Sequence, residues 1–281
     1  MKIIPEVKWK NLIEDLNNIR GVSMIIGATD SGKSSLLKYL LKELLRKNLV
    51  TSVIDSDVGQ SSLGLPGTVS MRIFYNEHDF DKFTFEKMSF VGTINPAMNM
   101  STIISITSKM TKICKENSDF VLIDTSGLIS GEIGKNLKIL KIKSIQPEHI
   151  IALQRENELE NILNFVENIY VHRIPVSCMV KIRSREERIL YRKIKLKDYF
   201  SNSKLNNFIV SKNSIICYYK KNSFIPKYAD CLQGKLIGLN YNDETKALGI
   251  VDEIDDGSII FTSPIDSLKN INKIIFGDMK I

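Results

Sequence analysis

The sequence predicts an α/β fold, in which helices cover both faces of a parallel sheet, followed by a small β module at the C-terminal end. Short apolar runs alternate with longer helix-like segments over about the first 175 residues, which is the rhythm of repeated strand-helix-strand units. After about residue 205 the rhythm changes to strands broken by turn residues. The chain has 281 residues, of which 43% are hydrophobic, enough for one substantial core and a smaller appended unit.

The strands and helices of the first part alternate as expected for a parallel sheet that is covered on both faces. The expected strands are 22–26, 50–54, 89–91, 120–123, 150–153 and 170–174. The expected helices are 33–47, 99–116, 132–144 and 157–167. This order predicts one main domain over residues 21–205.

The two ends of the chain are expected to differ from this main domain. Residues 206–281 form the expected β-rich domain, with strands at 214–219, 235–240, 247–254, 258–262 and 274–281. Turn residues at 241–243 and 255–257 separate some of these strands. Residues 1–20 contain the only tryptophan, Trp9, in a weakly amphipathic arm that we expect to pack on the main domain.

The composition argues against several classes of protein. Four cysteines are too far apart for a paired metal-ligand set or a dense disulfide framework, so we expect reduced thiols at Cys114, Cys178, Cys217 and Cys231. No run of about 18 uncharged apolar residues occurs, and the first residues lack the apolar run of a secretory signal. We therefore expect a cytoplasmic protein that does not cross a membrane. The sequence indicates no protein partner.

Positive charge is concentrated in one segment. The net charge is +7, and residues 181–197 contain eight basic side chains against two acidic ones. Such a segment favours a polyanionic partner, for example nucleotide phosphates or a nucleic-acid backbone. A solvated, lysine-rich helix is the alternative that the charge run alone leaves open.

Residues 27–34 contain the phosphate-binding pattern Gly-x-x-x-x-Gly-Lys-Ser between an apolar strand and a leucine-rich helix. In such a loop, backbone N–H groups and the helix N-terminus cradle phosphate oxygens. Lys33 then reaches the β- and γ-phosphates, and the Ser34 hydroxyl ligates Mg²⁺. The residues expected to hold ATP are Gly27, Thr29, Asp30, Ser31, Gly32, Lys33, Ser34 and Ser35. The fold is therefore expected to be of the P-loop NTPase type.

Three carboxylates follow apolar strands and are expected opposite this loop. Asp55 and Asp57 follow strand 50–54, and Asp124 follows strand 120–123. Because parallel strands end at one edge of a sheet, all three should face the γ-phosphate. Of the first two, one would organise the metal shell and the other would accept the proton of an attacking hydroxyl. Asp124 is a second metal candidate, although Asp-x-x-Gly is also the γ-phosphate sensor of GTPases.

Four motifs in order make the chain resemble the polynucleotide 5′-hydroxyl kinases. This family includes the kinase subunit of the eukaryotic pre-mRNA cleavage factor, a ribosomal-RNA-processing kinase and their archaeal relatives. The motifs are loop 27–34, segments 55–60 and 65–68, segment 125–127 with Gly131, and an arginine-rich lid around Arg188 and Arg192. Segments 91–99 and 154–156 are also similar. The resemblance covers about residues 21–200, roughly two thirds of the chain.

The resemblance implies roles on the acceptor side of the site. Asp57 would act on the nucleophilic hydroxyl, and a Thr-x-Gly-Trp element would clasp the terminal nucleotide. The residues that this implies for substrate contact are Gln60, Thr93, Thr125, Gly127 and Leu128. Leu128 stands where the family has tryptophan, and leucine does not provide an aromatic face for base stacking.

The arginine-rich lid, at about residues 181–199, is implied to close over the transferring phosphate. Arg188 and Arg192 are four residues apart, so they lie on one face of a helix. Their planar guanidinium groups form bidentate bonds with phosphate oxygens. Lys195 and Lys197 lie further along and are expected to follow the nucleic-acid backbone.

These observations lead to one main hypothesis and two alternatives. The main hypothesis is in-line transfer of the γ-phosphate of ATP, with Mg²⁺, to the 5′-hydroxyl of RNA or DNA. The expected catalytic residues are Lys33, Asp57, Arg188 and Arg192, and the expected metal ligands are Ser34, Asp55 and Asp124. One alternative is a regulatory or chaperone-like GTPase, although the guanine-reading Asn-Lys-x-Asp pattern does not occur. The other is a small-molecule kinase.

Overall fold

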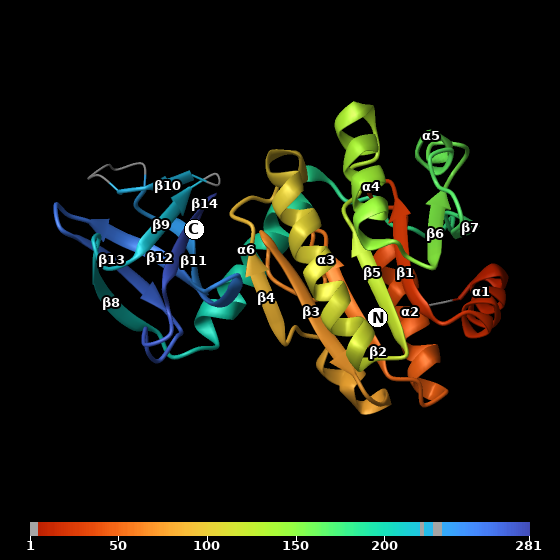
Figure 1. Ribbon diagram of the computed structural model, residues 1–281, viewed down its shortest axis with the longest axis horizontal. Helices are drawn as coiled ribbons and strands as arrows, with labels where there is room; N and C mark the ends of the chain where they lie inside the picture. Colours follow the sequence, from red (N-terminus) through yellow and green to blue (C-terminus); the bar gives the residue numbers. More distant parts are fainter. Residues whose placement is uncertain (1–4, 220–221, 227–231) are drawn as a thin grey trace.

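Two regions lie side by side in the computed structural model, which describes residues 5–219, 222–226 and 232–281. Figure 1 shows an α/β region on the right, a smaller β region on the left and a helix, α6, between them. Residues 1–4 of the expected arm and Cys231 lie outside the described residues.

The α/β region is built on five parallel strands in the order β2–β5–β1–β6–β7. These strands are β1 (Gly21–Gly27), β2 (Thr51–Ser56), β5 (Phe120–Thr125), β6 (His149–Gln154) and β7 (Tyr170–Pro175). Their register places Asp55 of β2 directly beside Asp124 of β5. The predicted parallel sheet is confirmed, and its carboxyl edge carries the phosphate loop and the acidic residues.

Two antiparallel strands extend this sheet beyond β2. Strand β3 (Thr68–Phe74), which the sequence analysis missed, pairs antiparallel with β2, and β4 (Lys87–Phe90) pairs antiparallel with β3. Strand 89–91 therefore runs in the same direction as the parallel strands, but the antiparallel β3 separates it from them and it pairs with none of them. The connections on both sides of β3 contain no α-helix, whereas a parallel crossover needs a dozen or more residues and usually a helix.

Helices cover both faces of the sheet, as predicted. The helices of this region are α1 (Val7–Asn18), α2 (Lys33–Arg46), α3 (Met100–Asn117), α4 (Gly131–Ile145) and α5 (Glu160–Leu163), with 3₁₀ turns η1 (Glu77–Lys82) and η2 (Pro96–Asn99). Trp9 of α1 and Leu40 of α2 belong to the apolar core on one face. Ile103 of α3 and Ile142 of α4 belong to the core on the other. The N-terminal arm thus packs on the main sheet.

Helix α5 is much shorter than the expected segment 157–167. The Glu158 carboxylate accepts hydrogen bonds from the backbone N–H groups of Arg155 and Glu156 at 2.8 and 2.9 Å, which stabilise a turn before the helix. After the helix, Asn168 adopts a left-handed conformation with φ 57°. Local side-chain bonding and a left-handed residue therefore confine the helix to a single turn.

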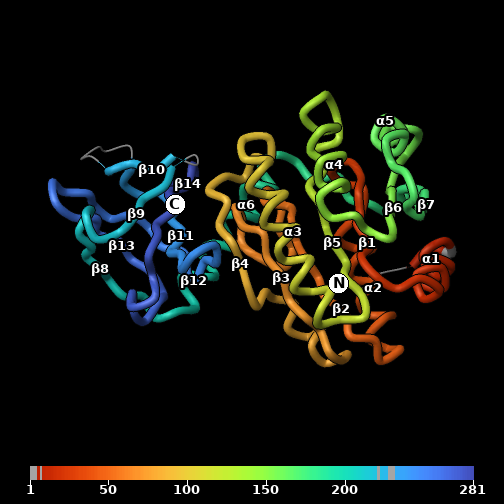
Figure 2. The backbone as a smooth tube through the Cα atoms, viewed as in Figure 1, coloured from red at the N-terminus to blue at the C-terminus, as the bar shows by residue number. Residues whose placement is uncertain are grey.

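Within its described residues, the β region contains seven strands, the first of which follows α6 directly. These strands are β8 (Asn206–Ser211), β9 (Ile216–Tyr219), β10 (Asn222–Phe224), β11 (Lys235–Tyr241), β12 (Glu244–Ile254), β13 (Ser258–Ser263) and β14 (Lys273–Lys280). Figure 2 follows the chain through them as the colour changes from teal to blue. The sequence analysis missed β8 and β10. An antiparallel pairing of Thr245 in β12 with Met88 in β4 joins this region to the main sheet.

Helix α6 (Arg185–Ser201) packs between the two regions. The residues of the predicted lid include this helix, which begins with a capping box in which Ser184 and Glu187 satisfy each other's backbone N–H groups. At its other end, Leu196 and Phe200 pack with Phe90 of β4 and with apolar side chains of β11 and β12. The lid helix is therefore anchored at its C-terminal half.

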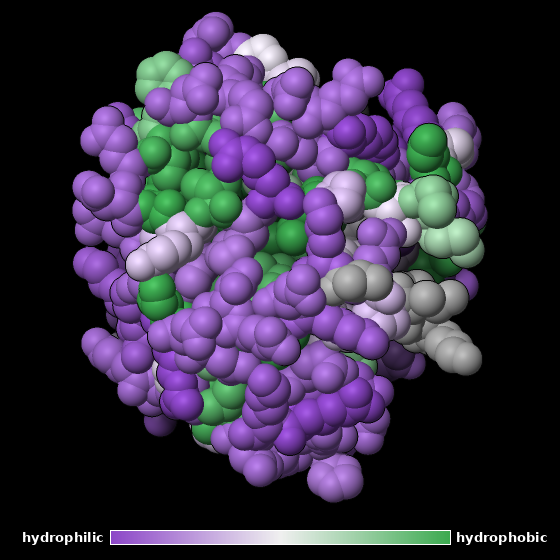
Figure 3. All heavy atoms as spheres, turned by 90° about the vertical axis from the view of Figure 1, so that its right-hand side faces the viewer, coloured by the Kyte–Doolittle hydropathy of each residue, from purple (hydrophilic) through white to green (hydrophobic). Residues whose placement is uncertain are grey.

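Polar side chains dominate the face formed by α1, α5 and β7, with apolar side chains gathered in patches between them (Figure 3). Within the described ranges, the cysteines are free thiols, as expected: Cys114 and Cys217 are buried and Cys178 is exposed. None of the helices in those ranges is both long and apolar enough to span a membrane.

Candidate active site

A cavity of about 760 Å³ lies over the carboxyl edge of the parallel strands. Most of its wall comes from four parts of the chain: the phosphate loop, the segment after β2, the segment after β5 and the lid with its preceding loop. Trp9 and Pro96 complete the lining. The expected site residues among its lining are Thr29, Asp30, Ser31, Gly32, Lys33, Ser34, Ser35, Asp57, Gln60, Gly127, Leu128, Arg188 and Arg192. Segments up to about 160 residues apart in sequence thus meet in one cavity.

The phosphate loop has the backbone that its glycines predict. Gly32, immediately before α2, has φ 89°, which is left-handed and favours glycine. Gly27 is packed so closely that a Cβ there would lie 2.6 Å from the Ser31 hydroxyl and 2.7 Å from the Leu153 carbonyl oxygen. Gly27 therefore lies beneath the cavity and shapes the loop without lining it.

Lys33 is folded back onto the loop. Its Nζ donates hydrogen bonds to the carbonyl oxygens of Gly27 and Ala28 at 3.1 and 2.7 Å. Burial lowers the pKa of this ammonium, while the nearby Asp124 carboxylate opposes that shift. The two carbonyl bonds hold the cation at the loop, where the oxygens of a polyphosphate are stronger partners.

Ser34 and Asp124 form the arrangement expected of magnesium ligands. The Ser34 hydroxyl donates to Asp124 Oδ2 at 2.5 Å, while Asp124 Oδ1 is buried and has no hydrogen-bond partner among the described residues. Burial, and next the neighbouring Asp55 carboxylate, raises the pKa of Asp124 to about 7. A hydroxyl beside a carboxylate with an unpaired oxygen fits a hard divalent cation, which binds oxygen ligands and favours the ionised acid.

Asp55 and Asp57 have different surroundings. Asp55 is fully buried, and its carboxylate accepts four hydrogen bonds, from the Ser61 hydroxyl and from the backbone N–H groups of Asp57, Ser62 and Leu63. These donors hold the loop after β2, so the expected metal role has less support for Asp55 than for Asp124.

Asp57 faces the cavity. Its Oδ1 accepts from the N–H groups of Gly59 and Gln60, both at 3.0 Å. Within the part of the chain that the structure describes, no group donates to its Oδ2. Asp57 therefore has one oxygen that fixes its orientation and one available to a hydroxyl in the cavity.

The segment after β5 only partly matches the expected nucleotide clasp. Gly127 lies against the phosphate loop, because a Cβ at this position would come within 2.6 Å of Thr29 backbone atoms, and Leu128 lines the cavity. Thr125, however, is fully buried and its hydroxyl donates to the Ile25 carbonyl oxygen at 2.7 Å. Thr93 lines a second cleft instead of this cavity.

The lid arginines converge on the phosphate loop. Arg188 Nη2 is 2.6 Å from Asp30 Oδ2, and the backbone N–H of Arg183 donates to the same oxygen at 3.1 Å. The Arg188 Nε is buried and has no hydrogen-bond partner among the described residues. Arg192 lines the same cavity, and burial, followed by the nearby Arg188 charge, lowers its pKa.

Lys195 does not have the surroundings expected of a residue that follows a nucleic-acid backbone. Its Nζ donates to the carbonyl oxygens of Ser62 and Gly64 at 2.8 and 2.9 Å, and burial lowers its pKa to about 8. One turn earlier, the Tyr191 hydroxyl donates to the Ser61 carbonyl oxygen at 3.0 Å. These bonds attach the lid to the loop that Asp55 organises.

Two buried lysines of α4 lie behind the carboxylates, and the sequence analysis missed both. Lys138 and Lys141 are at most 1% exposed. Lys138 Nζ donates to the Thr125 hydroxyl at 3.0 Å and to the Ser126 carbonyl oxygen at 2.5 Å, and Lys141 Nζ donates to the Ser56 hydroxyl at 2.8 Å. The available signal was their spacing, because both continue the apolar stripe of α4.

Comparisons with known proteins are consistent with this geometry. Residues 27–202 match the family model described as the mRNA cleavage and polyadenylation factor CLP1 P-loop. A polyribonucleotide 5′-hydroxyl-kinase of Pyrococcus horikoshii is 42% identical over 190 residues, which are 67% of this chain and 52% of that protein. One of Methanocaldococcus jannaschii is 39% identical over 189 residues, 66% of this chain and 51% of that protein.

The chain thus spans about half the length of the curated relatives that it matches. A solved structure of a Clp1p–Pcf11p complex resembles the whole described fold, with a TM-score of 0.75 at 12% identity over 97% of this chain and 78% of the other. At this identity the likeness concerns the fold alone, including the β region beyond the family match.

Proposed function

The chain belongs to the CLP1 P-loop family, and on that premise we propose that it is a kinase that transfers the γ-phosphate of ATP to the 5′-hydroxyl of a polynucleotide. The observation that carries the proposal is the convergence of Lys33, Asp57 and two lid arginines on one cavity. A phosphate-binding loop alone serves many reactions. A free carboxylate oxygen facing that loop, under a lid of arginines, suits transfer to a hydroxyl acceptor.

In the proposed reaction, the 5′ oxygen of the acceptor forms a bond with the γ-phosphorus while the bond from that phosphorus to the β,γ-bridging oxygen breaks, leaving ADP. Asp57 Oδ2 orients the acceptor hydroxyl and takes its proton. Lys33 and the loop amides hold the phosphates, and Arg188 and Arg192 stabilise the charge on the transferring group. Positioning supplies most of the catalysis, because no covalent enzyme intermediate is needed.

Magnesium would be held by Ser34 and Asp124, whose unpaired Oδ1 fits this role. When bound, the cation supplies charge neutralisation for the phosphate oxygens. Asp55 supports the site differently, because its four hydrogen bonds hold the loop that presents Asp57. Lys138 and Lys141 donate hydrogen bonds that hold the ends of β5 and β2 behind the acidic residues.

We further propose the division that the sequence predicted: an arm of residues 1–20, a kinase domain of residues 21–205 and a β domain of residues 206–281. The first strand of the β region begins at Asn206, which supports the second boundary. Trp9 lines the cavity, so the arm contributes to the nucleotide side of the site. The pairing of Thr245 in β12 with Met88 in β4 supports a fixed arrangement of the two domains.

The test is a transfer assay with γ-labelled ATP and Mg²⁺. Acceptors are RNA and DNA oligonucleotides with a 5′-hydroxyl, the same oligonucleotides with a 5′-phosphate, free nucleosides and no acceptor. We expect label on the 5′-hydroxyl oligonucleotides only, and none with the Lys33→Ala variant. Label on nucleosides but not oligonucleotides would contradict the polynucleotide substrate. Release of free phosphate without any transfer would contradict a kinase and favour the nucleotide-hydrolysing alternative.

A further inference from the structure

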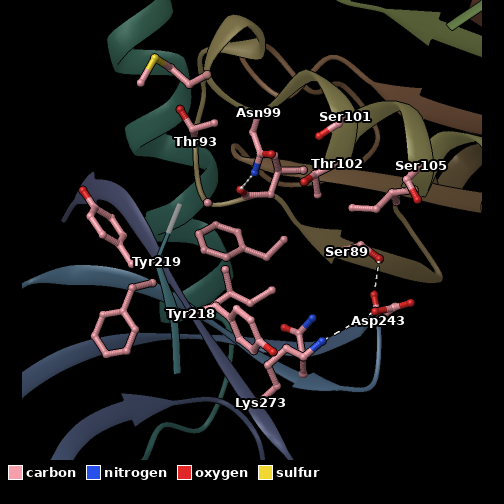
Figure 4. Close-up of a pocket in the computed structure, with 18 of the residues that line it drawn as sticks. Ser89, Thr93, Asn99, Ser101, Thr102, Ser105, Tyr218, Tyr219, Asp243 and Lys273 are labelled. Carbon is pink, nitrogen blue, oxygen red and sulfur yellow. Dashed lines mark hydrogen bonds and ion pairs between the residues drawn. The ribbon is translucent and has the colours of Figure 1, made fainter. Parts of the chain in front are cut away.

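A second cleft, of about 740 Å³, lies between the α/β region and the β region. One wall is formed by β4, the start of α3 and the segment between them, and the other by strands β9, β11 and β14. Figure 4 shows the polar side chains of α3 on one side, with Tyr218 and Lys273 on the opposite side. None of the residues that line this cleft also lines the phosphate-loop cavity.

One short segment separates this cleft from the proposed acceptor site. At one end, the Ile94 carbonyl oxygen would lie 3.1 Å from a Cβ at Gly59, two residues after the proposed base Asp57. At the other end, the Gly92 carbonyl oxygen accepts a hydrogen bond from the Asp278 N–H in β14 at 2.7 Å. A stretch of three residues spans at most about 10 Å. A polynucleotide with its 5′ end at Asp57 would therefore reach the cleft within a few nucleotides.

The expected substrate residue Thr93 lies in the middle of this segment and lines the cleft. Pro96, three residues further on, lines the phosphate-loop cavity. The two cavities thus share the segment between β4 and α3 as a common wall. The position of Thr93, outside the first cavity, is what a substrate extending beyond its terminal nucleotide requires.

The walls of the cleft offer groups that suit unpaired nucleotides. Ser101, Thr102 and Ser105 bring short hydroxyl side chains from α3 (Figure 4). Such groups form hydrogen bonds with base edges and with ribose hydroxyls. Opposite them, the half-buried Tyr218 offers an aromatic ring, and Lys273 Nζ lies 5.3 Å from its centroid. Aromatic rings with nearby cations are the usual stacking surfaces for single strands.

The charges that line the cleft are balanced. Asp243 forms ion pairs with both Lys109 and Lys273, so two cations share one carboxylate. Asp278 accepts a hydrogen bond from the Tyr219 hydroxyl at 2.9 Å, and Lys235 Nζ lies 4.5 Å from the ring of the same tyrosine. Two lysines and two aspartates thus line the cleft, and Lys235 adds a positive charge outside this lining. The two lysines of the lining can pair with the phosphates of one or two nucleotides.

We propose that this cleft binds the nucleotides that follow the 5′ terminal one in the acceptor strand, with a base stacked on Tyr218. The proposal rests on the proposed kinase function and specifies its substrate as a strand of several nucleotides. The ring of Tyr218 thus offers the acceptor strand an aromatic face, which Leu128 in the first cavity does not.

The first test compares acceptors of different length. We expect Tyr218→Ala to raise the KM for a 5′-hydroxyl oligonucleotide of about ten residues by about 5- to 100-fold, as loss of one stacked base predicts. Its kcat and KM for a nucleoside 3′-phosphate should not change, because that acceptor does not reach the cleft. Tyr218→Phe keeps the ring and should behave as the unchanged protein. Tyr75→Ala, which removes an exposed tyrosine elsewhere, is the matched control.

The second test changes charge at one exposed helix position. Ser105→Glu should raise the KM for the oligonucleotide, Ser105→Lys should lower it, and both effects should weaken with added salt, while Ser105→Ala should have little effect. Equal effects of Tyr218→Ala on long and short acceptors, or no effect on either, would overturn the cleft assignment.

Binding of the labelled oligonucleotide, measured by fluorescence anisotropy without ATP, distinguishes this failure from failure of the kinase proposal. If the unchanged protein transfers phosphate and the Tyr218 variant binds the strand equally well, only the cleft proposal is wrong, and a protein partner becomes the better candidate for its occupant. If the unchanged protein transfers phosphate to no acceptor, the kinase proposal is wrong, and the cleft proposal is wrong as well because it depends on the kinase function.

Discussion

The carboxyl edge of the parallel strands and the core of the β region are both well buried, but they are built from different side chains. At the carboxyl edge, five ionisable groups are buried: Lys33, Asp55, Asp124, Lys138 and Lys141. The core of the β region contains apolar side chains such as Ile259 and Phe261. Burying a charge costs far more free energy than burying a methyl group unless other groups compensate it. The buried ionisable groups, whose burial costs free energy, are therefore gathered in the region that we propose is catalytic.

If the chemistry is confined to the carboxyl edge and the lid above it, the largest loss of kcat is expected from substitutions in the lid. Arg188→Lys and Arg192→Lys should each lower kcat by about 10³-fold or more, because lysine keeps the charge but lacks the planar fork that contacts phosphate oxygens. Steady-state kinetics with an oligonucleotide acceptor provide the measurement. Arg185→Lys, at the exposed start of the same helix, is the control and should have little effect. A lid that serves only as a charged surface would instead leave all three variants nearly as active as the unchanged protein, because lysine keeps the positive charge.

The two acidic residues after β2 should separate catalysis from stability. Asp57→Asn should lower kcat by about 10²- to 10⁴-fold with an unchanged Tm, because its free oxygen acts only on the acceptor. Asp55→Asn should lower the free energy of unfolding by about 1–3 kcal/mol, because an amide presents donors to groups that need an acceptor. Kinetics and thermal unfolding of both variants decide the assignment. Similar defects that excess Mg²⁺ rescues in both would show that both carboxylates bind metal.

A smaller effect is expected in the dependence of stability on pH. Burial lowers the pKa of Lys141 from 10.5 to about 8, so between these values the unfolded chain binds more protons than the folded one. The free energy of unfolding therefore rises with pH across this window. Below it, folding must remove a proton from Lys141 or bury its charge, and above it the side chain is neutral in both states. The full shift corresponds to about 3 kcal/mol.

The measurement is denaturant unfolding at several pH values from about 7.5 to 10.5. Lys195, with a pKa that burial also lowers to about 8, contributes to the same window, so the informative quantity is the difference between the unchanged protein and Lys141→Met. The free energy of unfolding of Lys141→Met should rise less between these pH values than that of the unchanged protein. Parallel stability curves for the two proteins would indicate that Lys141 is hydrated and charged in the folded state.

The smallest effect is expected in the β region. Ile259→Val removes one methyl group from its core and should lower the free energy of unfolding by about 0.5–1.5 kcal/mol. Its kcat should not change, because this core contains none of the residues assigned to phosphate transfer. Thermal unfolding and the transfer assay check the two statements. A loss of activity at unchanged stability would mean that the β region takes part in the chemistry.

Several features of the site followed from the sequence because contiguous residues specify them. The phosphate loop needs glycine at its left-handed position, a strand before it and a helix after it, and residues 22–47 contain all three. The place of Asp124 at the carboxyl end of a strand likewise followed from the apolar residues that precede it, and the spacing of Arg188 and Arg192 put both on one face of a helix. Each of these predictions depends on local chain geometry, which a short segment carries in its own residues.

Other features were decided only by contacts between distant segments. Asp55 and Asp57 look alike in the sequence, but the donors at 61–63 surround one of them and leave the other facing the cavity. The sequence predicted Lys195 to be a surface cation, whereas in the structure its Nζ donates to the carbonyl oxygens of Ser62 and Gly64. The insertion of the antiparallel β3 between β2 and β4 was likewise decided by contacts between distant segments. The same holds for the position of Thr93 in the second cleft. Burial and hydrogen-bond partners are properties of the folded neighbourhood, so the sequence determined which groups were available for chemistry and the tertiary structure decided which of them face the substrate.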